Sequence, residues 1–347
     1  MKNWIKSEGD NSIVLSSRIR LARNIKNIPF PDKLSEEKGK DVVKQIEDAF
    51  YNSSYIEENY KSKYLWMNDD TTNKSYYEKH LISNKLLGNY KKSAFILDKD
   101  EVVSIMLNEE DHIRLQCITA GLNLDETYDL ANKLDNLLEE KLEFAFDEKF
   151  GYLTACPTNI GTGLRASVML HLPAVSMNND VARVFNAVTQ VGMTIRGLFG
   201  EGSKGEGDLY QVSNQITLGL TEEEIINNLK AVVVQIIDRE QWSREQFMKN
   251  YKYELEDKAH RSLGILKSAV LLDSKECLNL ISNVRMGVEM GIIKDVDINI
   301  LNSLLVETQP ATLQLISDVK LSNKDRDLNR AKLIRQRLSG NNLEKSL

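Results

Sequence analysis

The chain has 347 residues, of which 41% are hydrophobic and 28% are charged, a composition typical of a soluble globular protein with a sizeable core. This length predicts two domains, or one large domain with an appendage. The net charge of −6 argues against general binding to nucleic acids or membranes. No stretch approaches ~18 apolar residues and the start lacks the apolar run of a signal peptide, so no membrane segment is expected.

Local patterning along the chain predicts an α+β fold, an antiparallel sheet flanked by helices and followed by a helical C-terminal domain. Strands are expected at residues 12–20, 93–97, 102–107, 163–172, 193–199 and 209–217. Helices are expected at 41–51, 122–142, 180–191, 254–272, 274–290 and 323–338. A capping box of Thr221 and Glu224 opens another helix that runs to Ile237 or beyond. We expect a catalytic domain at 12–248 and a regulatory or oligomerisation domain at 249–347.

The three cysteines are odd in number and widely spaced, at Cys117, Cys156 and Cys277. This spacing fits neither a metal site nor a disulfide framework, so a reducing, cytoplasmic location is expected. Cys156 is either a nucleophile, with His171 as the only nearby histidine, or a packed supporting thiol, which we favour.

Five arginines lie in short segments rich in Ser, Gly and Glu, which is unusual in an acidic chain. They are Arg18 and Arg20 in SSRIR, Arg114 in NEEDHIR, Arg165 in CPTNIGTGLRAS and Arg196 in IRGLFGEG. Guanidinium groups present a rigid fork of donors that matches phosphate oxygens. Two of the segments also carry carboxylates, at Glu110 and Glu201. The combination points to phosphoryl transfer onto a basic acceptor, whereas any one of these arginines alone would be read as an ordinary surface residue.

The glycine-bearing segments are weaker signals. Gly200–Gly205 matches G-x-G-x-x-G, but a strand-like segment follows where a dinucleotide site needs a helix. We interpret it as either a hairpin tip or a mobile loop that closes over substrate. Residues 108–114 allow three interpretations. They are a solvated turn, a metal site, for which the adjacent spacing of the acids is poor, or a catalytic carboxylate beside the phosphate-binding Arg114.

These four segments, in this order and spacing, resemble the catalytic domain of the phosphagen (guanidino) kinases over residues 12–245. The resemblance implies that the five arginines clamp the nucleotide phosphates, that Glu110 and Glu201 hold the acceptor guanidinium as catalytic residues, and that His80 contacts the nucleoside. The ATP-binding segments implied in this way comprise Ser16, Ser17, Arg18, Ile19, Arg20, His80, Arg114, Arg165, Ala166, Ser167, Val168, Met169, Arg196, Gly197, Leu198, Phe199, Gly200 and Glu201.

The layout is similar to the bacterial protein arginine kinases of the McsB type, because SSRIR begins at Ser16 and leaves no room for the helical N-terminal domain that covers a small guanidino substrate. Arg326-Asp327-Leu328-Asn329-Arg330-Ala331 resembles the RDxxRA motif through which that family binds phosphoarginine allosterically. Because Arg326 and Arg330 are four residues apart, we expect both on one helix face. The alternative is a solvated amphipathic helix that buries Leu328, Ala331, Ile334 and Leu338.

The resemblance implies an ATP-dependent protein arginine kinase that marks proteins with exposed arginines for degradation by a Clp-type AAA+ unfoldase and protease, with a zinc-binding activator protein. Mg²⁺ is expected on the nucleotide phosphates and water, with no dedicated metal site. We expect a homodimer and neither nucleic-acid nor membrane partners. The alternatives are a small-molecule guanidino kinase and a non-catalytic adaptor that binds phosphoarginine.

Overall fold

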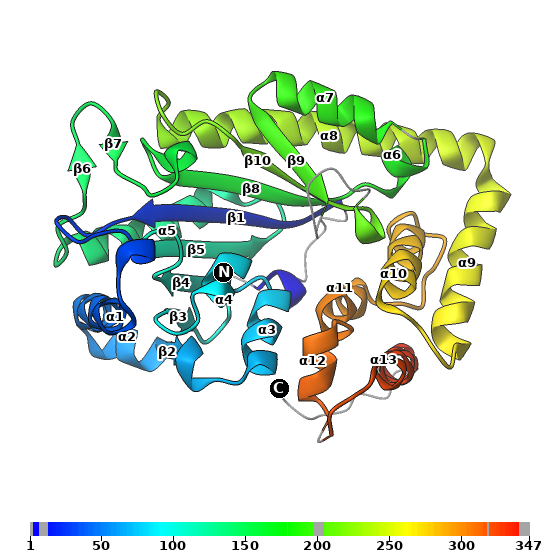
Figure 1. Cartoon of the computed structure of the whole chain (residues 1–347). Coiled ribbons are helices and arrows are strands. Elements are labelled where there is room, and N and C mark those ends of the chain that lie inside the picture. Colours follow the sequence, from blue (N-terminus) through cyan, green and yellow to red (C-terminus); the bar gives the residue numbers. More distant parts are fainter. Residues whose placement is uncertain (1–2, 7–12, 179, 198–204, 318, 340–347) are drawn as a thin grey trace.

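The computed structural model describes residues 3–6, 13–178, 180–197, 205–317 and 319–339. Their main feature is an eight-stranded sheet in which every neighbouring pair of strands is antiparallel (Figure 1). The predicted antiparallel sheet is therefore confirmed. In spatial order the strands are β2 (Tyr60–Tyr64), β3 (Ala94–Asp98), β4 (Val103–Leu107), β5 (Ile113–Ala120), β1 (Val14–Arg23), β8 (Leu164–His171), β10 (Leu209–Asn214) and β9 (Met193–Gly197).

One face of the sheet is covered by three amphipathic helices, α1 (Glu36–Phe50), α5 (Leu124–Glu139) and α8 (Glu222–Asn250). Alternate residues of the central strands supply the apolar side of this contact, among them Ile19 of β1 and Val168 of β8. The predicted capping box is confirmed at the start of α8, where the Thr221 hydroxyl accepts from the Glu224 amide and the Glu224 carboxylate accepts from the Thr221 amide.

The opposite face is covered only in part. At the β2 to β4 end, the segment with α3 (Asp70–Glu78) and α4 (Asn84–Gly88) packs a separate apolar cluster against Phe95 and Met106. This leaves the same face of β1, β8 and β10 for polar side chains. The short helices α2 (Ser54–Asn59), α6 (Pro173–Met177) and α7 (Val181–Gln190) and the hairpin of β6 (Phe146–Asp147) and β7 (Gly151–Tyr152) lie at the edges.

The chain continues beyond α8 as a helical region, which confirms the helical character predicted for the C-terminal part. It packs against the ends of the central strands through a cluster that includes Trp4, Leu15, Ile118 and Leu209, so the two parts share apolar contacts (Figure 1). None of the described helices is long and apolar enough to cross a membrane. The helices of this region are α9 (Lys252–Ser268), α10 (Ser274–Glu289), α11 (Ile298–Glu307), α12 (Pro310–Leu315) and α13 (Asn323–Leu338).

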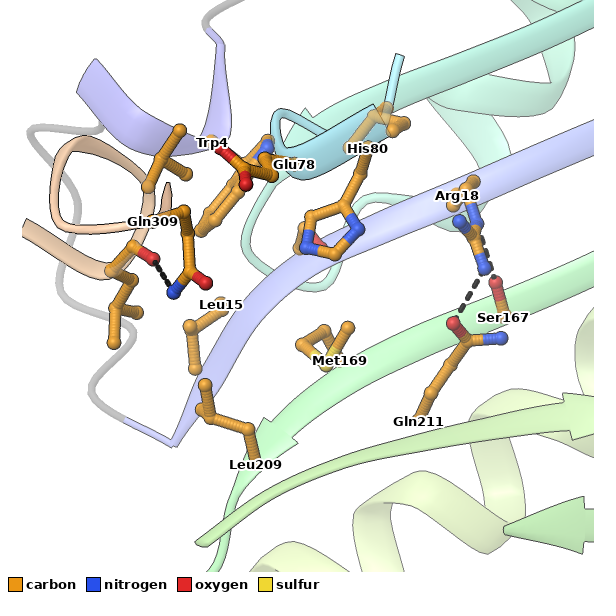
Figure 2. Close-up of a pocket in the computed structure, with 14 residues that line it drawn as sticks. Trp4, Leu15, Arg18, Glu78, His80, Ser167, Met169, Leu209, Gln211 and Gln309 are labelled. Carbon is orange, nitrogen blue, oxygen red and sulfur yellow. Dashed lines mark hydrogen bonds between the residues drawn. The ribbon is translucent and has the colours of Figure 1, made fainter. Parts of the chain in front are cut away.

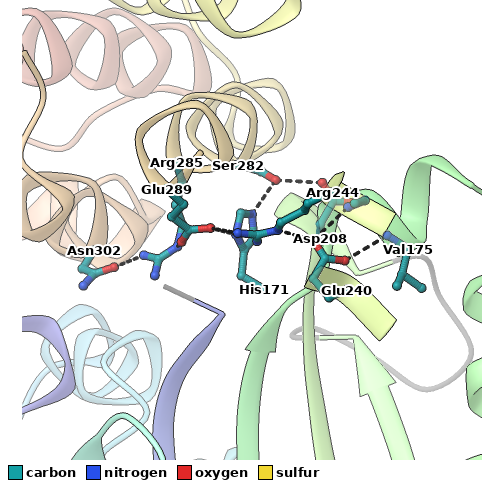
Figure 3. Close-up of polar contacts among 10 residues, drawn as sticks. His171, Val175, Asp208, Glu240, Arg244, Ser282, Arg285, Glu289 and Asn302 are labelled. Atoms are coloured by element: carbon teal, nitrogen blue, oxygen red, sulfur yellow. Dashed lines mark hydrogen bonds and ion pairs between the residues drawn. The ribbon is translucent and has the colours of Figure 1, made fainter. Parts of the chain in front are cut away.

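A buried polar network joins the sheet to these helices (Figure 3). Glu289 of α10 lies 2.8 Å from Arg244 of α8, 2.8 Å from Arg285 of α10 and 3.5 Å from His171 at the end of β8. The other nitrogen of His171 lies 2.9 Å from the hydroxyl of Ser282, which donates to Asp208. Burial alone would raise the pKa of Glu289, but Arg285, His171 and Arg244 together hold it below its ordinary value. The Glu289 carboxylate thus ties three elements together.

Candidate active site

The polar face of the central strands gathers the arginines that the sequence had singled out. In β1 the side chains of Arg18 and Arg20 point away from the core face, because side chains alternate along a strand. The antiparallel register places Arg165 of β8 opposite Arg20, and Ser167 opposite Arg18. On the other side of β1, Arg114 of β5 lies opposite Ala22, two residues beyond Arg20 on the same face. Four of the five predicted arginines therefore lie on three adjacent strands.

The fifth arginine lies farther along the same face. Arg196 of β9 pairs with Gln211 of β10, and Gln211 pairs in turn with Met169 of β8. Gln211 accepts a 2.5 Å hydrogen bond from Arg18, and Ser167 accepts another at 3.2 Å (Figure 2). These contacts fix the direction of the Arg18 guanidinium across three strands.

The electrostatics of this face favour an anion. Burial, followed by the charges of Arg114 and Arg165, lowers the pKa of Arg18 to about 9. Burial and the guanidinium groups of Arg18, Arg114 and Arg165 lower the pKa of Arg20 well below its ordinary value, against the attraction of Glu109. The Nε of Arg20 is buried and has no hydrogen-bond partner among the described residues. A bound polyanion would relieve the repulsion and supply that partner.

The loop between β4 and β5 is rigid and leaves one acid accessible. Glu109 is buried and pairs with Arg114 at 2.5 Å. Burial alone would raise the pKa of Glu109, but the charge and hydrogen bond of Arg114 hold it below its ordinary value. Asp111 accepts from Asn24 and from the Ala155 amide, both at 2.7 Å. Glu110 is partly exposed and has no side-chain hydrogen bond or ion pair within the described part of the chain. Its neighbours therefore hold the backbone while its own carboxylate is available.

A mostly apolar pocket continues from the arginines towards the C-terminal helices (Figure 2). Arg18 and Ser167 lie at one end, and the rings of Trp4 and His80 lie 5.9 Å apart within it. Burial and then the charge of Arg18 lower the pKa of His80 to about 4, so this imidazole is neutral at pH 7. The lining consists of Trp4, Leu15, Ser16, Arg18, Glu78, His80, Ile118, Ser167, Met169, Leu209, Gln211, Leu305, Val306 and Gln309.

The remaining predicted site residues divide into two groups. Ser16, Ser167 and Met169 line the pocket on the face of the arginines, whereas Gly197 ends β9 on the buried face, opposite Tyr210. The side chains of Ser17, Ile19, Ala166 and Val168 lie on the opposite, buried face, so only their backbone could approach a ligand there. The predicted Leu198, Phe199, Gly200 and Glu201 lie outside the described residues.

Arg326 and Arg330 lie four residues apart on α13, as expected for one helix face, but their surroundings differ. Arg330 is 2% exposed and donates to the carbonyls of Thr308 and Leu272 and to Asp327. Arg326 is partly exposed and lines a groove between α3, α12 and α13. The alternative amphipathic helix is wrong at Leu328, which is 43% exposed, although Ala331 and Ile334 are buried.

Cys156 and His171 do not form a nucleophilic pair, because they lie at opposite ends of β1. Ala155, next to Cys156, donates to Asp111, which binds Asn24 just after β1 ends, whereas the His171 amide donates to the Ile13 carbonyl just before β1 begins. The Cys156 sulfur instead lies 3.0 Å from the Thr158 hydroxyl, as expected for a supporting thiol. No group of three or more His, Cys, Asp or Glu side chains within the described ranges is arranged to hold a metal ion.

Several site residues were missed from the sequence. Gln116 and Gln211 lie on the same face of the sheet as the arginines. Gln116 is two residues from Arg114, and Gln211 is two residues from Ser213, so the period of a strand could have placed each pair on one face. Glu109 was not distinguished from Glu110, because adjacent acids look alike until one of them is buried. Trp4 and Gln309 carry no local signal, since they reach the pocket only through tertiary packing.

Comparison with known proteins agrees with this geometry. Residues 41–243 match the family described as ATP:guanido phosphotransferase, C-terminal catalytic domain, and residues 252–346 match the protein-arginine kinase McsB C-terminal domain. The protein-arginine kinase of Clostridium acetobutylicum is 63% identical, over 97% of this chain and 100% of that protein. The protein-arginine kinase of Halothermothrix orenii is 46% identical, over 98% of this chain and 97% of that one.

Solved structures share the fold at low identity. A crystal structure of lombricine kinase matches with a TM-score of 0.58 and 24% identity, over 68% of each chain. The duplicated taurocyamine kinase of Schistosoma mansoni, with bound transition state analog components, matches with a TM-score of 0.60 and 23% identity, over 75% of this chain and 39% of that one. Both family models and the full-length relatives agree, and the chain belongs to the protein-arginine kinase family of ATP:guanido phosphotransferases.

Proposed function

We propose that the protein transfers the γ-phosphoryl group of ATP to the guanidinium of arginine side chains in other proteins. The observation that carries the proposal is the cluster of guanidinium groups on β1, β5 and β8, which faces a pocket and has an available carboxylate beside it. Fixed cations stabilise the charge on a transferring phosphoryl group. Family membership and the relatives' names support arginine in proteins as the acceptor.

In the proposed reaction a guanidinium nitrogen of the acceptor forms an N–P bond as the bond between the γ-phosphorus and ADP breaks. An arginine guanidinium keeps its proton at pH 7 and is a poor nucleophile in that form. We assign Glu110 to orient the acceptor and to take up the proton, because its carboxylate has no partner in the described structure and it follows Glu109, which pairs with Arg114. Arg18, Arg20 and Arg165 would hold the phosphates and neutralise the charge that moves onto ADP.

Mg²⁺ would be held by phosphate oxygens and water, the coordination that this small ion usually keeps. Its chemistry would be to offset negative charge on the β- and γ-phosphates.

The direct test is to incubate the purified protein with ATP, Mg²⁺ and casein and to map phosphate by mass spectrometry under conditions that preserve acid-labile N–P bonds. We expect phosphate on arginine and none on serine or threonine. Free arginine and creatine serve as competing acceptors. Phosphorylation of these small molecules without any on casein would instead select a small-molecule guanidino kinase, and ADP binding without turnover would select a non-catalytic adaptor.

We infer that phosphoarginine also binds at α13, as the resemblance of residues 326–331 implies. The groove beside Arg326 also contains Lys74 and Lys320, which supports an anion there, although Asp69 and Asp70 line it too. Arg330 would have to exchange its partners to join the ligand. Titrating casein phosphorylation with free phosphoarginine in wild type and in an Arg326→Ala variant tests the site, and superimposable curves would remove it.

Family resemblance alone supports the remaining proposals. They are a cytoplasmic homodimer, stimulation by a zinc-binding activator protein, and delivery of phosphorylated proteins to a Clp-type AAA+ unfoldase. Free cysteines at Cys117, Cys156 and Cys277 are consistent with a reducing compartment. Sedimentation equilibrium measures the oligomeric state, and degradation of phosphorylated against unphosphorylated casein by a Clp protease measures the delivery.

A further inference from the structure

The far end of the pocket is built by a part of the chain outside the catalytic sheet. Gln309, which precedes α12, lies at the end of the pocket away from Arg18 (Figure 2), and Leu305 and Val306 of α11 line the pocket with it. Most of this end is apolar, with Trp4 and Met169 on the facing sides. An apolar slot adjoining a phosphate-binding face has the chemistry for a purine ring, whose flat surfaces are apolar and whose edge is polar.

Gln309 brings an acceptor atom into this apolar end. Its side chain is 6% exposed, and its Nε2 donates to the Leu305 carbonyl at 2.9 Å. A carbonyl only accepts, so the amide group facing Leu305 must be the NH₂, which fixes the orientation of the amide. The Oε1 atom points into the pocket and accepts no hydrogen bond from the described residues (Figure 2). A carbonyl oxygen that faces a mostly apolar pocket without a protein partner favours a ligand that donates to it.

The neighbouring carboxylate cannot take that role. Glu78 also lines the pocket, but its two oxygens accept from the amides of Ala311 and Thr312 and from the Thr312 hydroxyl, at 2.7 to 2.9 Å. These bonds hold the first turn of α12 against α3 and so fix the position of Gln309. The acceptor is therefore preorganised rather than free to rotate.

We propose that Gln309 reads the base of the nucleotide by accepting a hydrogen bond from the exocyclic amine of adenine. Guanine carries a carbonyl at the same position of the ring, which would face the Gln309 oxygen with a second acceptor. The amide cannot simply turn over to donate, because its NH₂ is committed to Leu305. The helical C-terminal region thus sets the preference for ATP over GTP, an inference that rests on the proposed nucleotide site of the sheet.

Calorimetry without a phosphoryl acceptor tests this contact. Wild type is titrated with ADP, with GDP and with purine riboside 5′-diphosphate, which is ADP without the exocyclic amine. We expect the last ligand to bind about tenfold more weakly than ADP, the effect of one lost hydrogen bond to a buried group, and GDP to bind more weakly still. In Gln309→Met, which keeps the length of the side chain, ADP and purine riboside 5′-diphosphate should bind alike.

A matched control is Gln235→Met on the exposed side of α8, which should reproduce the wild-type ratios. Equal binding of ADP and purine riboside 5′-diphosphate by wild type overturns the proposal even if the Gln309 variant fails to fold. So does a tenfold ratio that survives in Gln309→Met. If no nucleotide binds to wild type at all, the proposed function itself falls, which separates the two failures.

Discussion

The acids of the β4–β5 loop show how neighbouring residues of one type take different roles. Asn108, Asp111 and His112 hold the turn through backbone and side-chain bonds, and Glu109 neutralises Arg114. Glu110 contributes to none of this within the described structure except through its amide. Because the fold does not depend on the Glu110 carboxylate, this group is available for catalysis.

Replacing Glu110 by Gln therefore separates catalysis from folding. We expect phosphoryl transfer to casein to fall on the order of 10²-fold or more, because the general base is lost. ADP affinity and melting temperature should stay at wild-type values, as they should in the control Glu140→Gln at the exposed end of α5. A Glu110→Gln enzyme with near-normal turnover would rule out the assignment.

Two arginines of β1 make a second matched comparison. Arg20 lies among like charges on the face of the proposed nucleotide site, whereas Arg23 is buried against Asp135 at 2.7 Å and stacks 3.5 Å over the ring of Tyr152. Arg20→Met should leave the free energy of unfolding unchanged or raise it by up to ~1 kcal/mol, since replacing a desolvated charge that lies among like charges by an apolar group is often neutral or stabilising.

The same change should weaken ADP binding at least tenfold, because a charge-assisted contact to phosphate is lost. Arg23→Met should leave ADP binding unchanged. It should cost about 3–5 kcal/mol of stability, because Asp135 stays buried without its partner. Urea denaturation and calorimetry of both variants measure the two effects. A large loss of stability in Arg20→Met would show that Arg20 belongs to the fold and not to the site.

At the scale of elements, sequence patterning located the strands and helices with strong periodicity. Residues 323–338 form a helix as predicted, and β3 and β4 pair as the predicted hairpin. It missed β5, where Arg114 and Gln116 interrupt the apolar run because one face of this central strand serves the site. It also missed α11 and α12, since short helices leave a weak periodic signal.

The candidate site was predictable to a similar degree and for a similar reason. The arginines stand in distinctive segments, so a resemblance could find them. The burial of Arg330 and the contribution of Gln309 depend on contacts between segments far apart in sequence, such as Arg330 with Thr308, and no local pattern contains them.

The contact between Glu78 and the start of α12 is an element-scale prediction. The Glu78 carboxylate joins α3 to the start of α12, although Glu78 and Ala311 are 233 positions apart in sequence. Glu78→Ala leaves those amide donors unsatisfied and should cost about 1–3 kcal/mol. Hydrogen exchange of the amides in residues 308–317 should become faster, with unchanged exchange in β8 as the internal control. Identical exchange in both proteins would contradict the role of this contact.

At the scale of the whole molecule, the Glu289 network predicts how acid affects the fold. Because the folded pKa of Glu289 lies below its ordinary value of 4.5, its contribution to stability is present above pH 4.5 and is lost as the pH falls through the lower folded value. Glu289→Gln should cost about 3–5 kcal/mol at pH 7, since Arg244 and Arg285 remain buried without their shared counter-ion.

The measurement is urea unfolding of wild type and Glu289→Gln from pH 7 to pH 3. Other carboxylates titrate in the same range, so the difference between the two proteins isolates this residue. That difference should shrink below pH 4.5. A difference that stays constant with pH would mean that the carboxylate charge contributes nothing to joining the sheet to α8 and α10.

The two faces of β1 leave a mark on how the sequence tolerates change. Arg18 and Arg20 lie on the face of the proposed nucleotide site, and Ile19 and Leu21 face the core. In a library of every substitution along this strand, changes at the core-facing positions should lower cellular abundance. Changes at the alternate, site-facing positions should lower catalytic turnover instead, so the two effects should alternate with a period of two. Inserting a single residue before Arg18 would shift this order by one, so that guanidinium groups enter the core and isoleucine meets phosphate. We expect lineages of this family to vary the length of the chain around β1 and not within it.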